Sequence, residues 1–166
     1  MPEVVFDCCV LSNFALSDSL FILKNLYGSS AFLTDFVSAE IVKGIQSGHS
    51  GLSRIEDALA QGWLKEISLG RKGERAIWRT LTVSLGLGEA SSIAVAKIRG
   101  WLFACDDRVA RREAGLLGVK LTGTLGILKK AVRHRVVILK SADRILVRMT
   151  DHGFYSPVDS LRALGD

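Results

Sequence analysis

The stretch from Gly100 to Gly115 constrains the fold of this chain more than any other. It opens with a short apolar run, Trp101 to Cys105, which has the length and composition of a buried strand. Two adjacent acids, Asp106 and Asp107, follow at once, and residues 108–114 have the pattern of a helix. Open α/β sheets bind their ligands at the carboxyl ends of strands, so this stretch predicts the edge of an active site.

The rest of the chain alternates short apolar runs with helical patterns. Strands are expected at Pro2–Asp7, Ala31–Thr34, Trp63–Ile67 and Val119–Leu121, whereas Val136–Leu139 fits either a strand or a loop. Such alternation is typical of parallel strands that helices cover on both faces. We therefore expect one domain over residues 1–166, a three-layer α/β/α sandwich with a central parallel sheet.

Bulk properties exclude several classes of protein. No apolar run approaches the roughly 18 residues that span a bilayer, so we expect no membrane association. No basic and apolar leader opens the chain, and three cysteines cannot build a disulfide framework, which together predict a cytoplasmic protein. The net charge of +5 fits a polyanionic partner such as RNA, but it is explained equally well by solvation alone.

Three further acids occupy positions that match the Asp106–Asp107 pair. Asp7 ends the first strand, and Glu40 flanks the apolar stripe of a helix that starts near Phe36. Glu89 lies in the first turn of a helix, where the helix dipole favours its ionised form. Because strand ends and helix amino ends meet at one edge of a parallel sheet, these carboxylates are expected to converge.

Converging carboxylates repel one another unless cations neutralise them, and hard divalent cations prefer oxygen ligands. A carboxylate set without matching histidines or cysteines favours Mg²⁺ or Mn²⁺ over zinc. The chemistry that such a site supports best is metal-dependent hydrolysis of a phosphodiester. Taken singly, each acid also has an ordinary structural explanation, as a helix cap or as a solvated helix residue.

The order and spacing of these motifs resemble the PIN-domain family, which includes the VapC toxins of toxin–antitoxin pairs. The segments that carry the likeness are Val4–Asp7, Ser38–Ile41, Leu87–Ala94, Asp106–Arg111, Gly123–Leu128 and Gly153–Ser156. Each motif is short, and their order along nearly the whole chain is what makes the likeness specific.

The resemblance implies a nuclease, here a metal-dependent endoribonuclease that leaves 5′-phosphate and 3′-hydroxyl ends. Carried over by position, the catalytic acids are Asp7, Glu40, Glu89 and Asp107, and the metal ligands are Asp7, Glu89, Asp107 and Asp106. Asp107 matches the family's last acid, which leaves Asp106 as a supporting carboxylate. Family habit adds RNA as substrate, a homodimer and, for a toxin, a cognate antitoxin.

Several other residues are candidates for contact with the substrate. Arg71, Arg75 and Arg79 are spaced four apart, which predicts one helix face that contacts phosphate or is simply solvated. Thr124 follows Gly123 at a helix start, where it is placed to bond the scissile phosphate or a metal-bound water. Asn13, about one and a half helical turns beyond Asp7, is a candidate supporting group.

The remaining residues of note have simpler interpretations, and rival functions stay open. Cys8, Cys9 and Cys105 are expected to be small buried residues, and the three histidines are expected at the surface. A phosphoaspartate hydrolase of dehalogenase type needs an acid at position 9, which is a cysteine. A receiver domain would carry its acidic pair after the first strand. A catalytically silent PIN fold that serves as a scaffold or binds a partner remains the alternative.

Overall fold

A five-stranded parallel sheet forms the centre of the computed structural model, which describes residues 2–165. The strand order is β3-β2-β1-β4-β5, and every pair is parallel. The strands are β1 (Val4–Phe6), β2 (Ala31–Thr34), β3 (Leu64–Ile67), β4 (Leu102–Ala104) and β5 (Leu121–Thr122). The predicted α/β sandwich with a central parallel sheet is confirmed.

The middle strand β1 shows how the sheet is buried on both faces. Its three residues are fully inaccessible, as expected for a strand covered on both sides. Val4 and Phe6 join one apolar cluster, whereas Val5 points the other way and joins a second. This alternation follows from the two-residue period of a strand, and it divides the helices into two layers.

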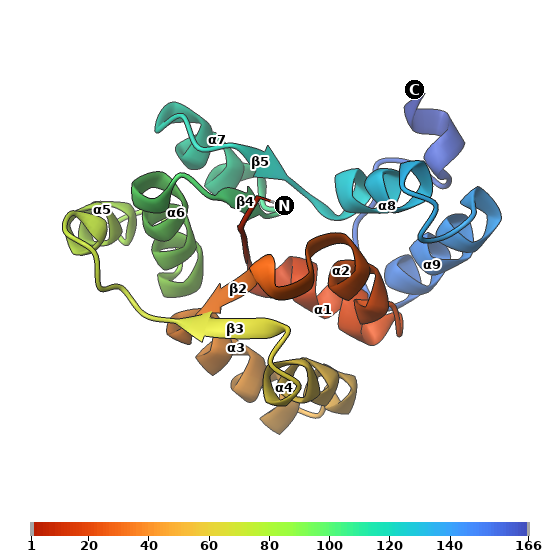
Figure 1. Ribbon diagram of the computed structural model, residues 1–166, viewed down its shortest axis with the longest axis horizontal. Helices are drawn as coiled ribbons and strands as arrows, with labels where there is room; N and C mark the ends of the chain where they lie inside the picture. Colours follow the sequence, from red (N-terminus) through yellow and green to blue (C-terminus); the bar gives the residue numbers. More distant parts are fainter. Residues whose placement is uncertain (1, 166) are drawn as a thin grey trace.

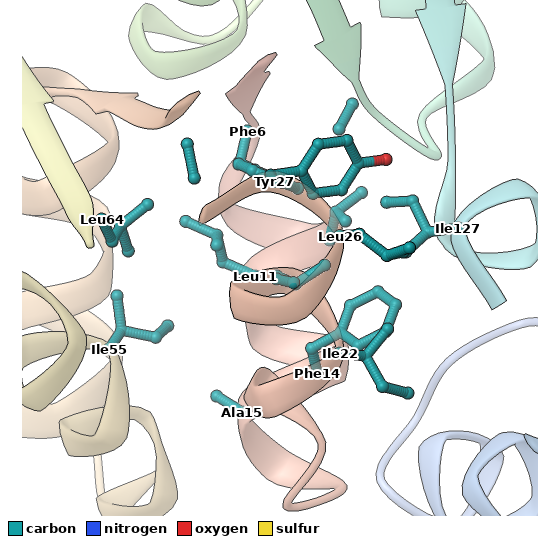
Figure 2. Close-up of a cluster of buried hydrophobic side chains, with 14 of the residues drawn as sticks. Phe6, Leu11, Phe14, Ala15, Ile22, Leu26, Tyr27, Ile55, Leu64 and Ile127 are labelled. Atoms are coloured by element: carbon teal, nitrogen blue, oxygen red, sulfur yellow. The ribbon is translucent and has the colours of Figure 1, made fainter. Parts of the chain in front are cut away.

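The larger cluster packs against helices on one face of the sheet. These are α1 (Cys8–Leu16), α2 (Leu20–Tyr27), α3 (Asp35–Gln46), α4 (Ser53–Ala60), α8 (Thr124–Arg133) and α9 (Leu139–Asp151). Figure 2 shows side chains of α1 and α2 filling this cluster, with Phe6 from the sheet beside Tyr27. The rings of Phe6 and Tyr27 meet edge to face, with centroids 5.6 Å apart.

The smaller cluster packs against the opposite face. Its helices are α5 (Glu74–Leu81), α6 (Leu87–Arg99) and α7 (Arg108–Leu116), which lie together on the other side of the sheet in Figure 1. Single 3₁₀ turns lie at Gly28–Ser30, Ser50–Leu52 and Leu161–Leu164.

The strand order creates a switch point between β1 and β4. The chain builds outward from β1 through β2 to β3, then returns to the other side of β1 for β4 and β5. Crevices form at such points, outside the carboxyl ends of the strands. Asp7 follows β1 there, Asp106 and Asp107 follow β4, and the Asp7 amide donates to the Ala104 carbonyl at 2.9 Å.

Two local details bear on the sequence-based expectations. Residues 136–138 form a loop, one of the two alternatives that the sequence left open, and α9 begins at Leu139. Arg71 is not on the helix that carries Arg75 and Arg79, because α5 begins only at Glu74. Gly73, with φ of +92°, ends the preceding turn, and the Glu74 carboxylate holds the amides of Gly70 and Arg71 in that turn. Between residues 2 and 165, no helix has the length and apolarity to cross a membrane.

Candidate active site

Asp7 is the most buried acid at the switch point. It is 2% exposed at the start of α1, and its pKa is raised to about 7. Burial is the main cause, and the charges of Glu89 and then Glu40 raise the pKa further, while the amides of Cys8 and Cys9 lower it. These effects place Asp7 near two other predicted site acids.

Glu40 reaches this region from α3. Burial raises its pKa, whereas the backbone N–H of Gly88 and the charge of Lys43 lower it. A Cβ built on Gly88 would lie 2.6 Å from Glu40 Oε1, so only a glycine leaves room for this carboxylate. The amino end of α6 therefore receives Glu40 through its backbone.

Glu89 lies in the first turn of α6, as predicted. Its Oε2 accepts a weak hydrogen bond from the Gly86 amide at 3.4 Å, which is half of a capping box, since Gly86 has no side chain to complete it. The pKa of Glu89 is nevertheless raised, by burial first and then by the charges of Asp107 and Glu40. Burial and repulsion between carboxylates thus outweigh the favourable helix dipole that the sequence indicated.

The two acids after β4 have different surroundings. Asp107 is exposed and caps α7, with Oδ1 accepting from the Ala110 amide at 2.8 Å. Asp106 is half-buried and accepts bonds from the Thr124 amide (2.8 Å), the Thr124 hydroxyl (2.5 Å) and Asn13 Nδ2 (3.2 Å). Asp107 is thus the freer carboxylate, and Asp106 is the more firmly oriented one.

Thr124 and Asn13 form a support for Asp106. Thr124 is fully buried, and its hydroxyl also accepts from Asn13 Nδ2 at 3.1 Å. A Cβ on Gly123 would lie 2.7 Å from Asp106 Oδ1, so this position requires glycine too. The network joins α1, the end of β4 and the start of α8, and it fixes the direction of one site carboxylate.

A second buried network was not predicted from the sequence. Thr34 and Ser91 share a hydroxyl–hydroxyl bond of 2.7 Å, and Ser91 and Ser92 each donate to the Gly88 carbonyl. These bonds tie the end of β2 to the amino end of α6. They hold in place the backbone that receives Glu40. The sequence contains two serines shortly after Glu89, but no local pattern in it pairs Ser91 with Thr34.

The predicted cationic residues lie on α5 and in the turn before it. Arg71, Arg75 and Arg79 are exposed, and only Arg75 and Arg79 lie on α5. Among the cysteines, Cys105 is buried as expected, with its thiol 4.0 Å from Asp7 Oδ2, whereas Cys9 is exposed and so departs from the expectation. The three histidines are at the surface.

The donor chemistry of this region fits a hard divalent cation. Burial raises the pKa values of Asp7, Glu40 and Glu89, and neighbouring carboxylates raise those of Asp7 and Glu89 further, a repulsion that a cation relieves. Within residues 2–165, no three side chains of His, Cys, Asp or Glu lie close enough together to hold a metal ion. Mg²⁺ keeps several waters and is often bound through one or two carboxylates, so the absence of a three-ligand group does not conflict with it.

Fold and site together define a class of protein, the parallel α/β sandwich with acids at its switch point. A family model described as a PIN domain matches residues 3–164, so the chain belongs to the PIN-domain family. PIN domains are generally nucleases and typically use divalent metals, which makes this a nuclease-type fold. A search of curated proteins found no match.

Proposed function

We propose that this protein is an Mg²⁺- or Mn²⁺-dependent endoribonuclease that hydrolyses phosphodiester bonds of RNA. The observation that carries the proposal is the position of Asp7 directly after β1, where its amide bonds the Ala104 carbonyl of β4 and where Asp106 and Asp107 follow that strand. Repelling acids at a ligand-binding edge are the arrangement that a cation-dependent hydrolase needs. Membership of a family whose members are generally nucleases supports the same conclusion.

In this proposal Asp7, Glu89, Asp107 and Asp106 hold the metal, and Glu40 completes the catalytic set. When bound, the metal supplies an activated water and neutralises charge on the phosphate. Asn13 and Thr124 keep the Asp106 carboxylate oriented. Glu40, whose pKa is raised by burial, is suited to accept a proton at its carboxylate. Arg71 is a further proposed contact of the RNA, whereas the Thr124 hydroxyl, which the sequence suggested for that role, is buried and bonded to Asp106 and Asn13.

The test is cleavage of varied RNAs in Mg²⁺ or Mn²⁺ by the wild type and by Asp7→Asn, Asp107→Asn and Asp106→Asn. We expect the first two variants to lose at least about 100-fold in rate, since each removes a charge that binds metal. Undiminished cleavage by both would refute the proposal. If Asp106→Asn is as damaging as Asp107→Asn, the firmly oriented Asp106 is a primary ligand.

A second function has one observation in its favour. No three acids in the described part of the chain are close enough for one ion, which also fits a catalytically silent PIN fold that binds a partner. Wild-type protein that cleaves no RNA under either metal would support this alternative. Retention of all the site acids favours the nuclease.

We further propose a toxin role in a cytoplasmic toxin–antitoxin pair and a homodimeric state. Growth arrest on expression would support the toxin role if a small protein encoded by an adjacent gene relieves it. Light scattering on the purified protein would give the oligomeric state directly.

A further inference from the structure

A hollow of about 260 Å³ lies beside the carboxyl ends of β2 and β3, apart from the acids described above. Its walls come from Asp35 and Phe36 at the start of α3, Ser68 after β3, and Arg75, Trp78 and Arg79 on α5. In Figure 1 the chain leaves the arrowhead of β3 and runs directly into α5, so this connection borders the hollow. The hollow combines aromatic, cationic and hydrogen-bonding groups.

Two aromatic rings form its apolar wall. Phe36 and Trp78 are stacked, with ring centroids 5.1 Å apart and planes 27° from parallel. Neither residue is fully buried. The indole N–H of Trp78 is buried and has no acceptor among residues 2–165. A donor left without an acceptor is unfavourable, and a small shift of the ring toward a ligand acceptor would satisfy it.

Two arginines form its cationic rim. Arg75 and Arg79 are exposed, lie one turn apart on α5 and share a face with Trp78. Neither takes part in an ion pair within the described residues. The nearby Asp35 is already engaged, because its carboxylate accepts from Ser68 Oγ and the Phe36 amide, each at 3.0 Å. The guanidinium groups therefore remain available to an anion.

The wall of the hollow is held firmly by a buried ion pair. Glu74 is fully buried, accepts from Arg99 Nε at 2.6 Å and holds the amides of Gly70 and Arg71. Arg99 also donates to the Ser68 carbonyl at 3.2 Å. The connection between β3 and α5 is thus preorganised, which reduces the entropy lost on binding.

The hollow is one helical turn from the proposed catalytic acids. Phe36 and Glu40 are four residues apart on α3, so they share a face about 6 Å apart along the helix axis. Glu40 in turn meets the amino end of α6 at Gly88. A chain bound at the acids can therefore continue into the hollow.

We propose that this hollow binds one nucleotide of single-stranded RNA next to the cleaved bond. The base packs on the Phe36–Trp78 pair, and its phosphate lies between Arg75 and Arg79. Aromatic stacking with adjacent cations is how proteins bind single strands without a strict sequence requirement. The inference rests on the proposed ribonuclease function for its substrate, but it is tested by binding alone.

The experiment measures affinity for a fluorescent single-stranded oligoribonucleotide by anisotropy, in EDTA so that no cleavage occurs. The variants are Arg75→Ala, Arg79→Ala and their combination, with Arg144→Ala on the exposed face of α9 as the matched control. We expect the double variant to weaken binding at least about tenfold. Its salt dependence should fall by about 0.7 in slope for each lost phosphate contact, and the control should match the wild type.

Trp78→Leu adds a test of stacking and should weaken binding at least about fivefold at unchanged salt slope. Because Trp78 also packs against the core, the fold of the Trp78→Leu variant is checked by circular dichroism. If that variant unfolds, the arginine variants alone test the proposal. If the arginine double variant binds RNA with wild-type affinity and wild-type salt dependence, the proposal is wrong. The same result is expected if the hollow binds an acidic protein segment instead of RNA. Cleavage data are separate: a protein that binds RNA here but does not cut refutes only the nuclease.

Discussion

At the scale of single residues, Asp7 links the candidate site to stability. Its pKa is about 7 in the folded chain against 3.8 for an ordinary aspartate, so the folded state holds the proton more tightly. Below about pH 4 Asp7 is protonated in the folded and in the unfolded chain, so its raised pKa costs no stability there. As pH rises toward 7, Asp7 ionises in the unfolded chain but stays protonated in the folded one, and the fold loses stability. The loss levels off above pH 7.

We therefore predict that Asp7→Asn stabilises the metal-free protein at pH 8 while abolishing cleavage. The gain in unfolding free energy should reach up to about 4 kcal/mol at pH 8 and vanish near pH 4. Chemical denaturation in EDTA at both pH values measures it. A variant less stable than the wild type at pH 8 would contradict the assigned burial and repulsion.

A second prediction at the scale of residues concerns Gly123 and Gly88. Gly123→Ala should lower stability by about 1–3 kcal/mol, because its Cβ would displace Asp106 from Thr124 and approach the Cys105 carbonyl at 3.2 Å. Gly88→Ala should instead spare stability and reduce cleavage, since the flexible end of Glu40 can move away. Gly115→Ala on α7 is the control, because its Cβ meets nothing within 4 Å. Equal changes in stability and in cleavage rate at all three glycines would contradict the close approaches proposed at Gly123 and Gly88.

At the scale of elements, the connection between β3 and α5 depends on the ion pair of Glu74 and Arg99. Burial raises the pKa of Glu74, but the bonds from Arg99 and from the amides of Arg71 and Gly70 hold it below its usual value. Its stabilising contribution is therefore present above the unfolded pKa and is lost as pH falls through the folded one.

We predict that Glu74→Ala lowers the unfolding free energy by about 3 kcal/mol or more at pH 7, because Arg99 and two amides lose their acceptor. The matched control is Glu113→Ala, whose partner Arg112 is largely exposed, and it should change stability by less than about 1 kcal/mol. Urea denaturation of both variants provides the comparison. Equal losses would mean that the buried pair contributes no more than a surface one.

The same elements show what the sequence predicts and where it stops. The acids after β1 and β4 were predictable, because a short apolar run followed by an acid is a local pattern and parallel strand ends share an edge. Arg71 was assigned to one helix face with Arg75 and Arg79 because its spacing resembles a helix, whereas Gly73 and the Glu74 carboxylate form a turn there. The Thr34–Ser91 bond joins residues 57 apart, and no local pattern encodes such a partner.

At the scale of the whole molecule, strand order decides which acids meet. Alternating strands and helices indicate a parallel sheet but not its order, and the pairing of β1 with β4 in the order β3-β2-β1-β4-β5 brings Asp7 beside the end of β4. The support of Asp106 likewise depends on the tertiary fold, because Asn13 is 93 residues away in the chain. Global topology thus completes a site that local motifs only outline.

Mg²⁺ should therefore act on the stability of the whole molecule in a pH-dependent way. At pH 8, above the folded pKa of Asp7, the Asp7 carboxylate is ionised and repels Glu89 and Glu40, so an ion that binds only the folded state relieves the repulsion. At 100 times its dissociation constant, such an ion adds about 2.7 kcal/mol to the unfolding free energy. At pH 5, below the folded pKa of Asp7, binding must first displace a proton, and the gain should be much smaller.

Thermal melts with and without Mg²⁺ at pH 5 and 8 measure this difference, and calorimetry in buffers of different ionisation enthalpy detects the released proton. Asp7→Asn is the control, since it removes the group whose proton is displaced, and it should lose most of the pH dependence. Equal stabilisation at both pH values would place the bound ion away from Asp7. A pH-dependent gain in the wild type alone would establish that the buried carboxylate at the end of β1 and the cation are linked, independently of any assay of cleavage.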